Sequence, residues 1–266
     1  MFGHAEAYER FMGRWSRAVA PLLVGFTPLP DDGRVLDVGS GTGSLAFAIA
    51  ERKPGCDVLG VDPSEQYIAY ANNRNPSPDR VNFETGDAQK LRFPDATFQA
   101  SLSLLVFNFI PDPVKALREL RRVTCPGGCI SAAVWDYGAG MRMLRVFWDA
   151  AVSMDANAEN HDEKHMPLCR AGELSGAWKQ AGLESVHEQP LDITTRFESF
   201  ADYWDAFLLG QGPAGAYVSS LDGDQRNTLR AEVRHRLPLS SDGQPFALRA
   251  RVWSVRGTVP ARPWKA

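Results

Sequence analysis

The chain has 266 residues, 44% of them hydrophobic, and a formal net charge of −3. That length accommodates an α/β domain with a substantial core and an additional cap. The balanced charge lacks the polybasic signature of nucleic-acid and membrane binders, so we expect no nucleic-acid partner.

The N-terminal segment predicts a helix and argues against export. Tyr8, Phe11 and Trp15 recur at helical spacing, whereas charged residues such as Glu6 interrupt the apolar core that a signal peptide needs. The longest apolar run, Leu102 to Ile110, is too short to cross a bilayer. We therefore expect a cytoplasmic protein with no membrane span.

After this helix, apolar runs alternate with helical segments, the pattern of βαβ units and a parallel sheet covered on both faces. The first half of the chain is expected to form strands and helices over residues 34–38, 44–52, 58–61, 64–73, 81–84, 98–107, 114–123 and 128–135.

The pattern is less regular beyond residue 136. Helices are expected over residues 141–154 and 172–181 and at the start of an aromatic-rich segment from Phe197, with a strand over residues 185–195. Alternating residues 246–256 predict a last strand at a sheet edge. The fold class is α/β: a Rossmann-like, doubly wound, mostly parallel seven-stranded sheet with an antiparallel edge strand and helical cap insertions.

The strongest chemical signal is the turn Asp37-Val38-Gly39-Ser40-Gly41-Thr42-Gly43, which joins a strand to a helix. Glycines there permit positive φ and leave bare backbone for a ligand, and the helix N-terminus favours electron-rich groups. Two further acids, Asp62 and Asp87, follow apolar runs at a spacing of 25 residues. Ligands of parallel sheets bind at such strand ends.

The two later acids suit an adenosine ligand. Asp62 is placed to accept hydrogen bonds from ribose hydroxyls, and Asp87 to accept one from the adenine amine while the Ala88 amide donates to a ring nitrogen. Each acid alone serves equally well as a helix cap. A dinucleotide fingerprint needs glycine where this chain has Ser44, and no Gly-Lys-Ser/Thr of a P-loop follows.

At this point the chain resembles the class I S-adenosylmethionine-dependent methyltransferases, in the small-molecule branch of ubiquinone and menaquinone C-methyltransferases. The residues that carry the resemblance are Val35 to Gly43, Val61-Asp62-Pro63-Ser64, Gly86-Asp87-Ala88, Phe93-Pro94-Asp95 through Phe98, Ala116 to Val123, and Pro126-Gly127-Gly128.

The resemblance implies S-adenosylmethionine as cofactor and S-adenosylhomocysteine as product. It also implies a single methyltransferase domain over residues 1–266, with an N-terminal cap helix (1–30), a cofactor-binding core (34–136), cap insertions (137–170 and 197–240) and a tail (257–266). The implied cofactor-binding residues are Tyr8, Arg14, Gly39, Ser40, Gly41, Asp62, Pro63, Asp87, Ala88, Ser103 and Leu104.

The sequence says less about the residues that bind and activate the acceptor, because transfer from an electrophilic sulfonium needs mainly alignment and exclusion of water. His161 and His165, in a polar loop, and Asp136 and Tyr137, beyond the fifth strand, are candidate bases. A partly apolar small-molecule acceptor is expected from the later aromatic residues, among them Trp135, Trp148, Phe197, Phe200, Tyr203, Trp204, Phe207 and Tyr217.

No metal is expected. Metal-dependent catechol-type methyltransferases need a carboxylate just past the fourth strand, which here reads Ser103-Leu104-Leu105-Val106, and leucine cannot ligate magnesium. The four cysteines lack the spacing of a ligand set. Two other functions stay open: an adenosylmethionine-binding module without catalysis, and a nicotinamide-dependent oxidoreductase on the same fold.

Overall fold

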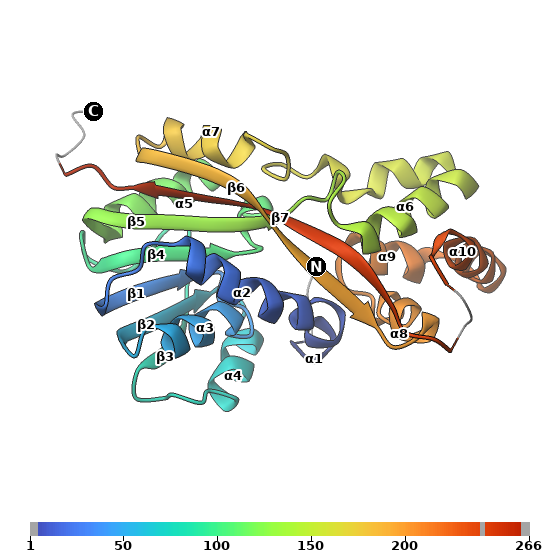
Figure 1. The fold of residues 1–266 in the computed structure, drawn as a ribbon, viewed down its shortest axis with the longest axis horizontal. Helices are drawn as coiled ribbons and strands as arrows, with labels where there is room; N and C mark the ends of the chain where they lie inside the picture. The colour runs from blue at the N-terminus through green and yellow to red at the C-terminus, as the bar shows by residue number, and fades with distance from the viewer. Residues whose placement is uncertain (1–4, 240–242, 262–266) are drawn as a thin grey trace. The chain divides into compact units, whose positions relative to one another are not determined.

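A computed structural model describes residues 5–239 and 243–261 of the chain. Seven strands form one sheet in the order β3-β2-β1-β4-β5-β7-β6 (Figure 1). The strands are β1 (Asp32–Val38), β2 (Gly55–Asp62), β3 (Val81–Thr85), β4 (Phe98–Leu104), β5 (Thr124–Trp135), β6 (Glu184–Phe197) and β7 (Phe246–Thr258). The α/β fold class is confirmed.

Up to β5, a helix follows β1, β2 and β4, whereas no helix separates β3 from β4. The α-helices are α1 (Ala5–Tyr8), α2 (Arg14–Phe26), α3 (Ser44–Arg52), α4 (Glu65–Asn73), α5 (Pro113–Val123), α6 (Arg142–Met154), α7 (Glu173–Gln180), α8 (Phe200–Trp204), α9 (Gly212–Ser220) and α10 (Gly223–Arg236). A π-helical turn, Glu9–Gly13, links α1 to α2. Within the described residues, no helix has the length and apolar character to cross a bilayer.

The first four strands position the site. β1 pairs in parallel with β2 and β4, so that Leu36 lies opposite Leu59 on one side and Ser101 on the other. Because parallel strands end at the same edge of the sheet, the residues that follow β1, β2, β3 and β4 share one edge. Helix α5 is fixed to the sheet by its buried face, which includes Leu117 and Leu120.

The last strand, β7, lies inside the sheet between β5 and β6. Its hydrogen bonds show that it is antiparallel: Gly127 donates to Val259 O at one end of β5, and Asp136 donates to Arg251 O at the other. The prediction that residues 246–256 form a sheet edge is therefore wrong, and β6 is the edge. Alternation of apolar and polar residues indicates that one face of a strand is exposed. An interior antiparallel strand can also have one exposed face, so the pattern does not identify an edge.

Strand β4 is shorter than predicted. Leu105 has φ of +63°, so the extended conformation expected to continue to Phe107 stops at Leu104. Phe107 instead begins a 3₁₀ turn, Phe107–Phe109, where its ring lies 5.1 Å from that of Trp178. An apolar run predicts burial but does not distinguish a strand from a buried turn.

The described chain divides into two compact units. Unit 2 comprises residues 15–134, 167–191 and 253–266 and contains the parallel strands. Unit 1 comprises residues 1–14, 135–166 and 192–252. The beginning of the predicted tail belongs to the sheet, since β7 runs to Thr258 and Val259 donates to Gly128 O. Residues 262–266 of that prediction, like residues 1–4 of the N-terminal cap, lie outside the described part of the chain.

Candidate cofactor site

The glycine turn follows β1 directly and begins α3. Its three glycines have φ of +71°, +51° and +91° at Gly39, Gly41 and Gly43. The amides of Gly39 and Ser40 both donate to Val61 O, at 2.7 and 3.1 Å. The turn is thereby fastened to the end of β2.

Two of these glycines are required for different reasons. A Cβ on Gly39 would lie 2.5 Å from the side chain of Val106, so Gly39 is needed for packing. A Cβ on Gly41 would meet nothing nearer than a backbone oxygen at 4.0 Å. The backbone of Gly41 therefore faces open space, which a ligand can occupy.

Asp62 connects the glycine turn to the following helix. Its Oδ2 accepts a hydrogen bond from the Gly41 amide at 3.0 Å, and its Oδ1 accepts one from the Ser64 amide at 2.9 Å. Burial raises the pKa of Asp62, and these two amides oppose that effect. Each carboxylate oxygen has a further lone pair, so the group retains capacity to accept hydroxyl donors.

Asp87 lies in the turn after β3, and that turn is tied to the same centre. The Gly86 amide donates to Asp62 O at 3.1 Å, and the Lys90 amide donates to Asp87 O at 3.0 Å. The Asp87 side chain is exposed, and its Oδ1 accepts the Gln89 amide at 2.8 Å. The structure thus brings Gly39, Ser40, Gly41, Asp62 and Asp87 together, as predicted.

Several buried polar atoms around the turn have no hydrogen-bond partner among the described residues. They are the side-chain oxygens of Ser40, Ser44 and Ser103. Buried polar groups are normally paired. Together with the open backbone of Gly41, these atoms fit a polar ligand with several hydrogen-bonding groups.

Asp37 is not among the predicted cofactor-binding residues, although it lies at the end of β1 beside the glycine turn. It is completely buried, and burial raises its pKa to about 8; a hydrogen bond from the Ala46 amide opposes this effect, and the charge of Asp62 adds to it. The available signal was the acid at the end of β1, beside the glycines. The carboxyl group therefore carries a proton at neutral pH when no ligand compensates its charge.

The wall after β4 is strained. Leu105 adopts the left-handed conformation, which costs a non-glycine residue about 1 kcal/mol or more. Its amide donates to Ala133 O at 2.7 Å, and the next residue, Val106, packs against Gly39. The left-handed residue thus redirects the chain after Ser103 and Leu104, and Val106 lies against the glycine turn.

Of the other predicted cofactor residues, Pro63 and Ala88 belong to unit 2, next to Asp62 and Asp87 in the chain, whereas Tyr8 and Arg14 belong to unit 1. Nη1 of Arg14 donates to both carboxylate oxygens of Asp202, at 3.0 Å each, and the guanidinium lies 5.0 Å from the centre of the Phe197 ring. This pairing accounts for the charge of Arg14 without a cofactor carboxylate. Tyr8 is half-buried in the same unit.

The candidate bases also belong to unit 1. His161 and His165 are exposed, and His165 Nε2 lies 3.1 Å from Glu159. Asp136 is buried, and its Oδ1 accepts the Ala139 amide at 3.1 Å. These contacts give Asp136 and His165 local structural roles.

The aromatic residues predicted for an acceptor pocket form the core of unit 1. Phe147 stacks on Phe207 with ring centres 4.5 Å apart, and the hydroxyl of Tyr203 donates to Met143 O at 2.7 Å. The buried members of the predicted set are Trp135, Trp148, Phe197, Phe200, Tyr203, Trp204 and Phe207.

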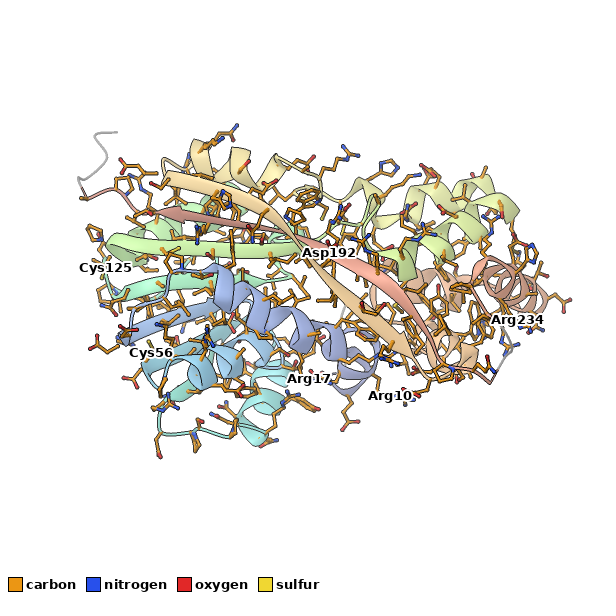
Figure 2. All side chains as sticks on the ribbon, in the orientation of Figure 1. Arg10, Arg17, Cys56, Cys125, Asp192 and Arg234 are labelled. Carbon is orange, nitrogen blue, oxygen red and sulfur yellow. The ribbon has the colours of Figure 1, made fainter. Side chains whose placement is uncertain are left out.

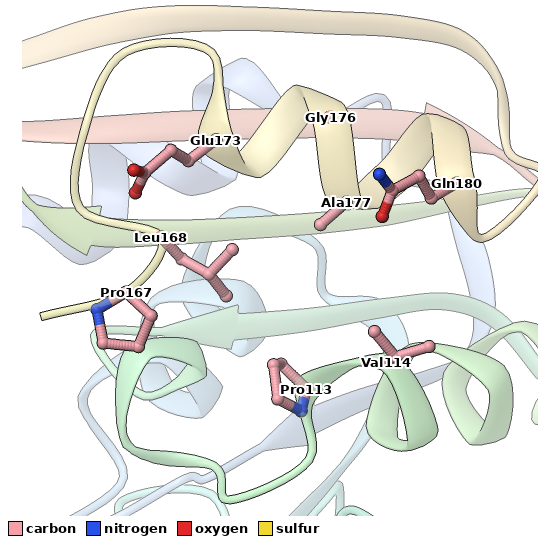
Figure 3. A pocket seen from close by; sticks show the side chains of 8 residues that line it. All are labelled: Pro113, Val114, Pro167, Leu168, Glu173, Gly176, Ala177 and Gln180. Carbon is pink, nitrogen blue, oxygen red and sulfur yellow. The ribbon is translucent and has the colours of Figure 1, made fainter.

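A separate groove of about 430 Å³ lies between α5 and α7 in unit 2 (Figure 3). It is mostly apolar, and its lining residues include Val114, Leu168 and Ala177. None of the predicted site residues lines it. Cys56 and Cys125, near the beginnings of β2 and β5, lie at the other end of the strands from the glycine turn (Figure 2).

Residues 36–132, which include the turn, Asp62 and Asp87, match the family model of the methyltransferase domain. This part of the chain is a class I methyltransferase domain. The prediction of a methyltransferase domain is confirmed over these residues.

Relatives and a solved structure agree with this assignment. The methyltransferase domain region is 38% identical over 116 residues to the demethylmenaquinone methyltransferase of Thermus thermophilus, covering 43% of this chain and 51% of that protein. A 178-residue match to the 27-O-demethylrifamycin SV methyltransferase of Amycolatopsis mediterranei is 37% identical and covers 65% and 62%. The chain spans about half the length of the first relatives it matches. The YcgJ protein of Bacillus subtilis shares the fold, with a TM-score of 0.59 at 18% identity over 93% of this chain and 99% of that one.

Proposed function

We propose that the protein is an S-adenosylmethionine-dependent methyltransferase that transfers a methyl group to a small, partly apolar acceptor by in-line displacement. The observation that carries this proposal is the arrangement of Asp62, which accepts the Gly41 amide, next to the open backbone of Gly41 and the unpartnered buried hydroxyl of Ser40. The names of the two relatives, a demethylmenaquinone and a demethylrifamycin methyltransferase, support an acceptor of this kind.

The chain's own residues bind and orient the cofactor. Asp62 accepts from the ribose hydroxyls, the open backbone of Gly41 borders the methionyl part, and Asp87 with Ala88 holds the adenine. The chain after Ser103 and Leu104 passes beside the reacting centre. The sulfonium supplies a methyl group that is already electrophilic, so alignment and exclusion of water account for most of the catalysis.

A general base is needed only where the acceptor is protonated. Asp136, Tyr137, His161 and His165 remain the proposed candidates, and Tyr8 and Arg14 remain proposed cofactor contacts. Alanine substitution of each, followed by separate measurement of cofactor affinity and turnover, assigns these roles.

The test is calorimetry with S-adenosylhomocysteine, followed by a transfer assay with S-adenosylmethionine and a panel of quinol and phenolic acceptors. We expect binding of the product and formation of a methylated acceptor detectable by mass spectrometry. Binding without turnover on any acceptor would favour the non-catalytic module. Binding of a reduced nicotinamide dinucleotide instead would favour the oxidoreductase.

A glycine substitution provides a second prediction. Gly41→Ala places a Cβ in the open space where the methionyl part is proposed to lie, so we expect binding of S-adenosylhomocysteine to weaken at least roughly tenfold while the protein folds. The matched control is Gly172→Ala, because Gly172 also has positive φ (+84°) and open surroundings but precedes α7. Both variants should lose about 1 kcal/mol of stability. Equal binding by the two variants contradicts the placement of the cofactor at Gly41.

A further inference from the structure

The side chain of Gln89 joins the turn after β3 to the beginning of α5. Its Nε2 donates to Asp87 Oδ1 at 3.1 Å and lies 3.4 Å from Asp87 Oδ2. Its Oε1 accepts the backbone amide of Asp112 at 3.1 Å. One amide group therefore bridges two segments separated by more than twenty residues.

The chemistry of the two partners determines how this amide is oriented. A carboxylate only accepts hydrogen bonds and a backbone N–H only donates them. The NH₂ group of Gln89 must therefore face Asp87, and its oxygen must face Asp112. No other orientation satisfies both ends, so the bridge is specific to an amide side chain at position 89.

The far end of the bridge is rigid. Asp112 is the N-cap of α5, and its Oδ1 accepts the Lys115 amide at 2.9 Å. Helix α5 is held by a buried face that includes Leu117 and Leu120. An exposed aspartate on a turn is thereby connected to a fixed part of the fold.

The bridge treats the two oxygens of Asp87 differently. Oδ1 accepts both the backbone amide and the side chain of Gln89, at 2.8 and 3.1 Å. Among the described residues, Oδ2 has only the longer contact of 3.4 Å. One carboxylate oxygen is thus occupied, and the other keeps its lone pairs for an external donor.

We propose that Gln89 is a positioning residue that makes the site selective for 6-aminopurine nucleosides over their 6-oxo counterparts. It holds Asp87 so that Oδ2 accepts a hydrogen bond from the exocyclic amine of adenine. A 6-oxopurine presents a carbonyl oxygen at that position, which a fixed carboxylate repels. The inference rests on the proposed function and on the assignment of Asp87 to the adenine.

The experiment compares S-adenosylhomocysteine with S-inosylhomocysteine, in which the 6-amino group is replaced by oxygen. Dissociation constants of both are measured by calorimetry for the wild type, Gln89→Met and Gln89→Glu. Methionine keeps the length of the side chain but forms neither hydrogen bond, and glutamate keeps the acceptor toward Asp112 but repels Asp87. We expect the wild type to prefer the adenine ligand at least roughly tenfold. Both variants should lose most of that preference.

The control is Gln99→Glu, because Gln99 also links two segments of unit 2, accepting the Arg34 amide at 2.6 Å near the beginning of β4. This variant should keep the wild-type preference. Equal weakening of both ligands in the Gln89 variants would mean that Gln89 only stabilises the turn, and would overturn the proposal, as would an unchanged preference or a wild type without one. A wild type that binds neither ligand would instead contradict the proposed function.

Discussion

Replacing Asp62 with alanine is expected to weaken the binding of S-adenosylhomocysteine at least roughly a hundredfold. The variant loses a buried acceptor for the ribose hydroxyls. It also releases the amide of Gly41, which Asp62 accepts at 3.0 Å, and that of Ser64, at 2.9 Å. The substitution thus removes a ligand contact and loosens the turn that forms the neighbouring wall of the site. Calorimetry measures the affinity.

The control for this prediction is Asp57→Ala, because Asp57 is exposed on the same strand, five residues before Asp62. We expect this variant to bind S-adenosylhomocysteine like the wild type. Asp62→Asn separates the two effects, since an asparagine oxygen still accepts from one of the two amides. An Asp62→Ala variant that is folded and binds normally would remove Asp62 from the cofactor site.

The buried carboxyl of Asp37 is expected to make the ligand-free protein less stable as the pH rises. Its pKa is about 8 in the folded protein and near the ordinary aspartate value in the unfolded chain, so between these values only the folded state holds the proton. The free energy of unfolding then falls with increasing pH, by up to roughly 1.4 kcal/mol per pH unit. From pH 5 to pH 8 the accumulated loss is on the order of 4 kcal/mol.

Asp37→Asn removes this titration. The free energy of unfolding of the variant, relative to that of the wild type, should therefore be higher at pH 8 than at pH 5. Urea unfolding of both proteins at several pH values measures the difference. Glu163, whose pKa burial raises to about 7, titrates in the same range, but it is present in both proteins and cancels in the comparison. Parallel stability profiles of the two proteins would show that Asp37 does not hold a proton in the folded state.

Features of the fold that depend on near neighbours in the chain were predictable. The helix Ser44–Arg52 has the predicted bounds, because a glycine turn precedes it and an apolar face fixes its length. The position of β7 between β5 and β6 was not predictable from alternation, because the pairing joins residues more than a hundred positions apart. Strand β4 ends early because Leu105 adopts the left-handed backbone conformation, which its residue type does not predict.

The candidate site shows the same division. Glycines and strand-end acids predicted Gly41, Asp62 and Asp87, since each carries its chemistry in its own residue type. The contact between Gly41 and Asp62, and the role of Gln89, depend on distances between segments that meet only after the sheet has formed. The burial that alters Asp37 is likewise a property of the packed protein.

The two compact units are built from different stretches of the chain, so changes of length in one need not alter the other. Asp37, Asp62, Asp87 and Gln89 all lie in the uninterrupted stretch of unit 2 from residue 15 to residue 134, whereas unit 1 is assembled from three separate stretches. Residues 137–166 and 198–239 take no part in the pairings that set the register of the first four strands. We therefore expect changes of length in those stretches to leave the proposed cofactor-binding residues in place.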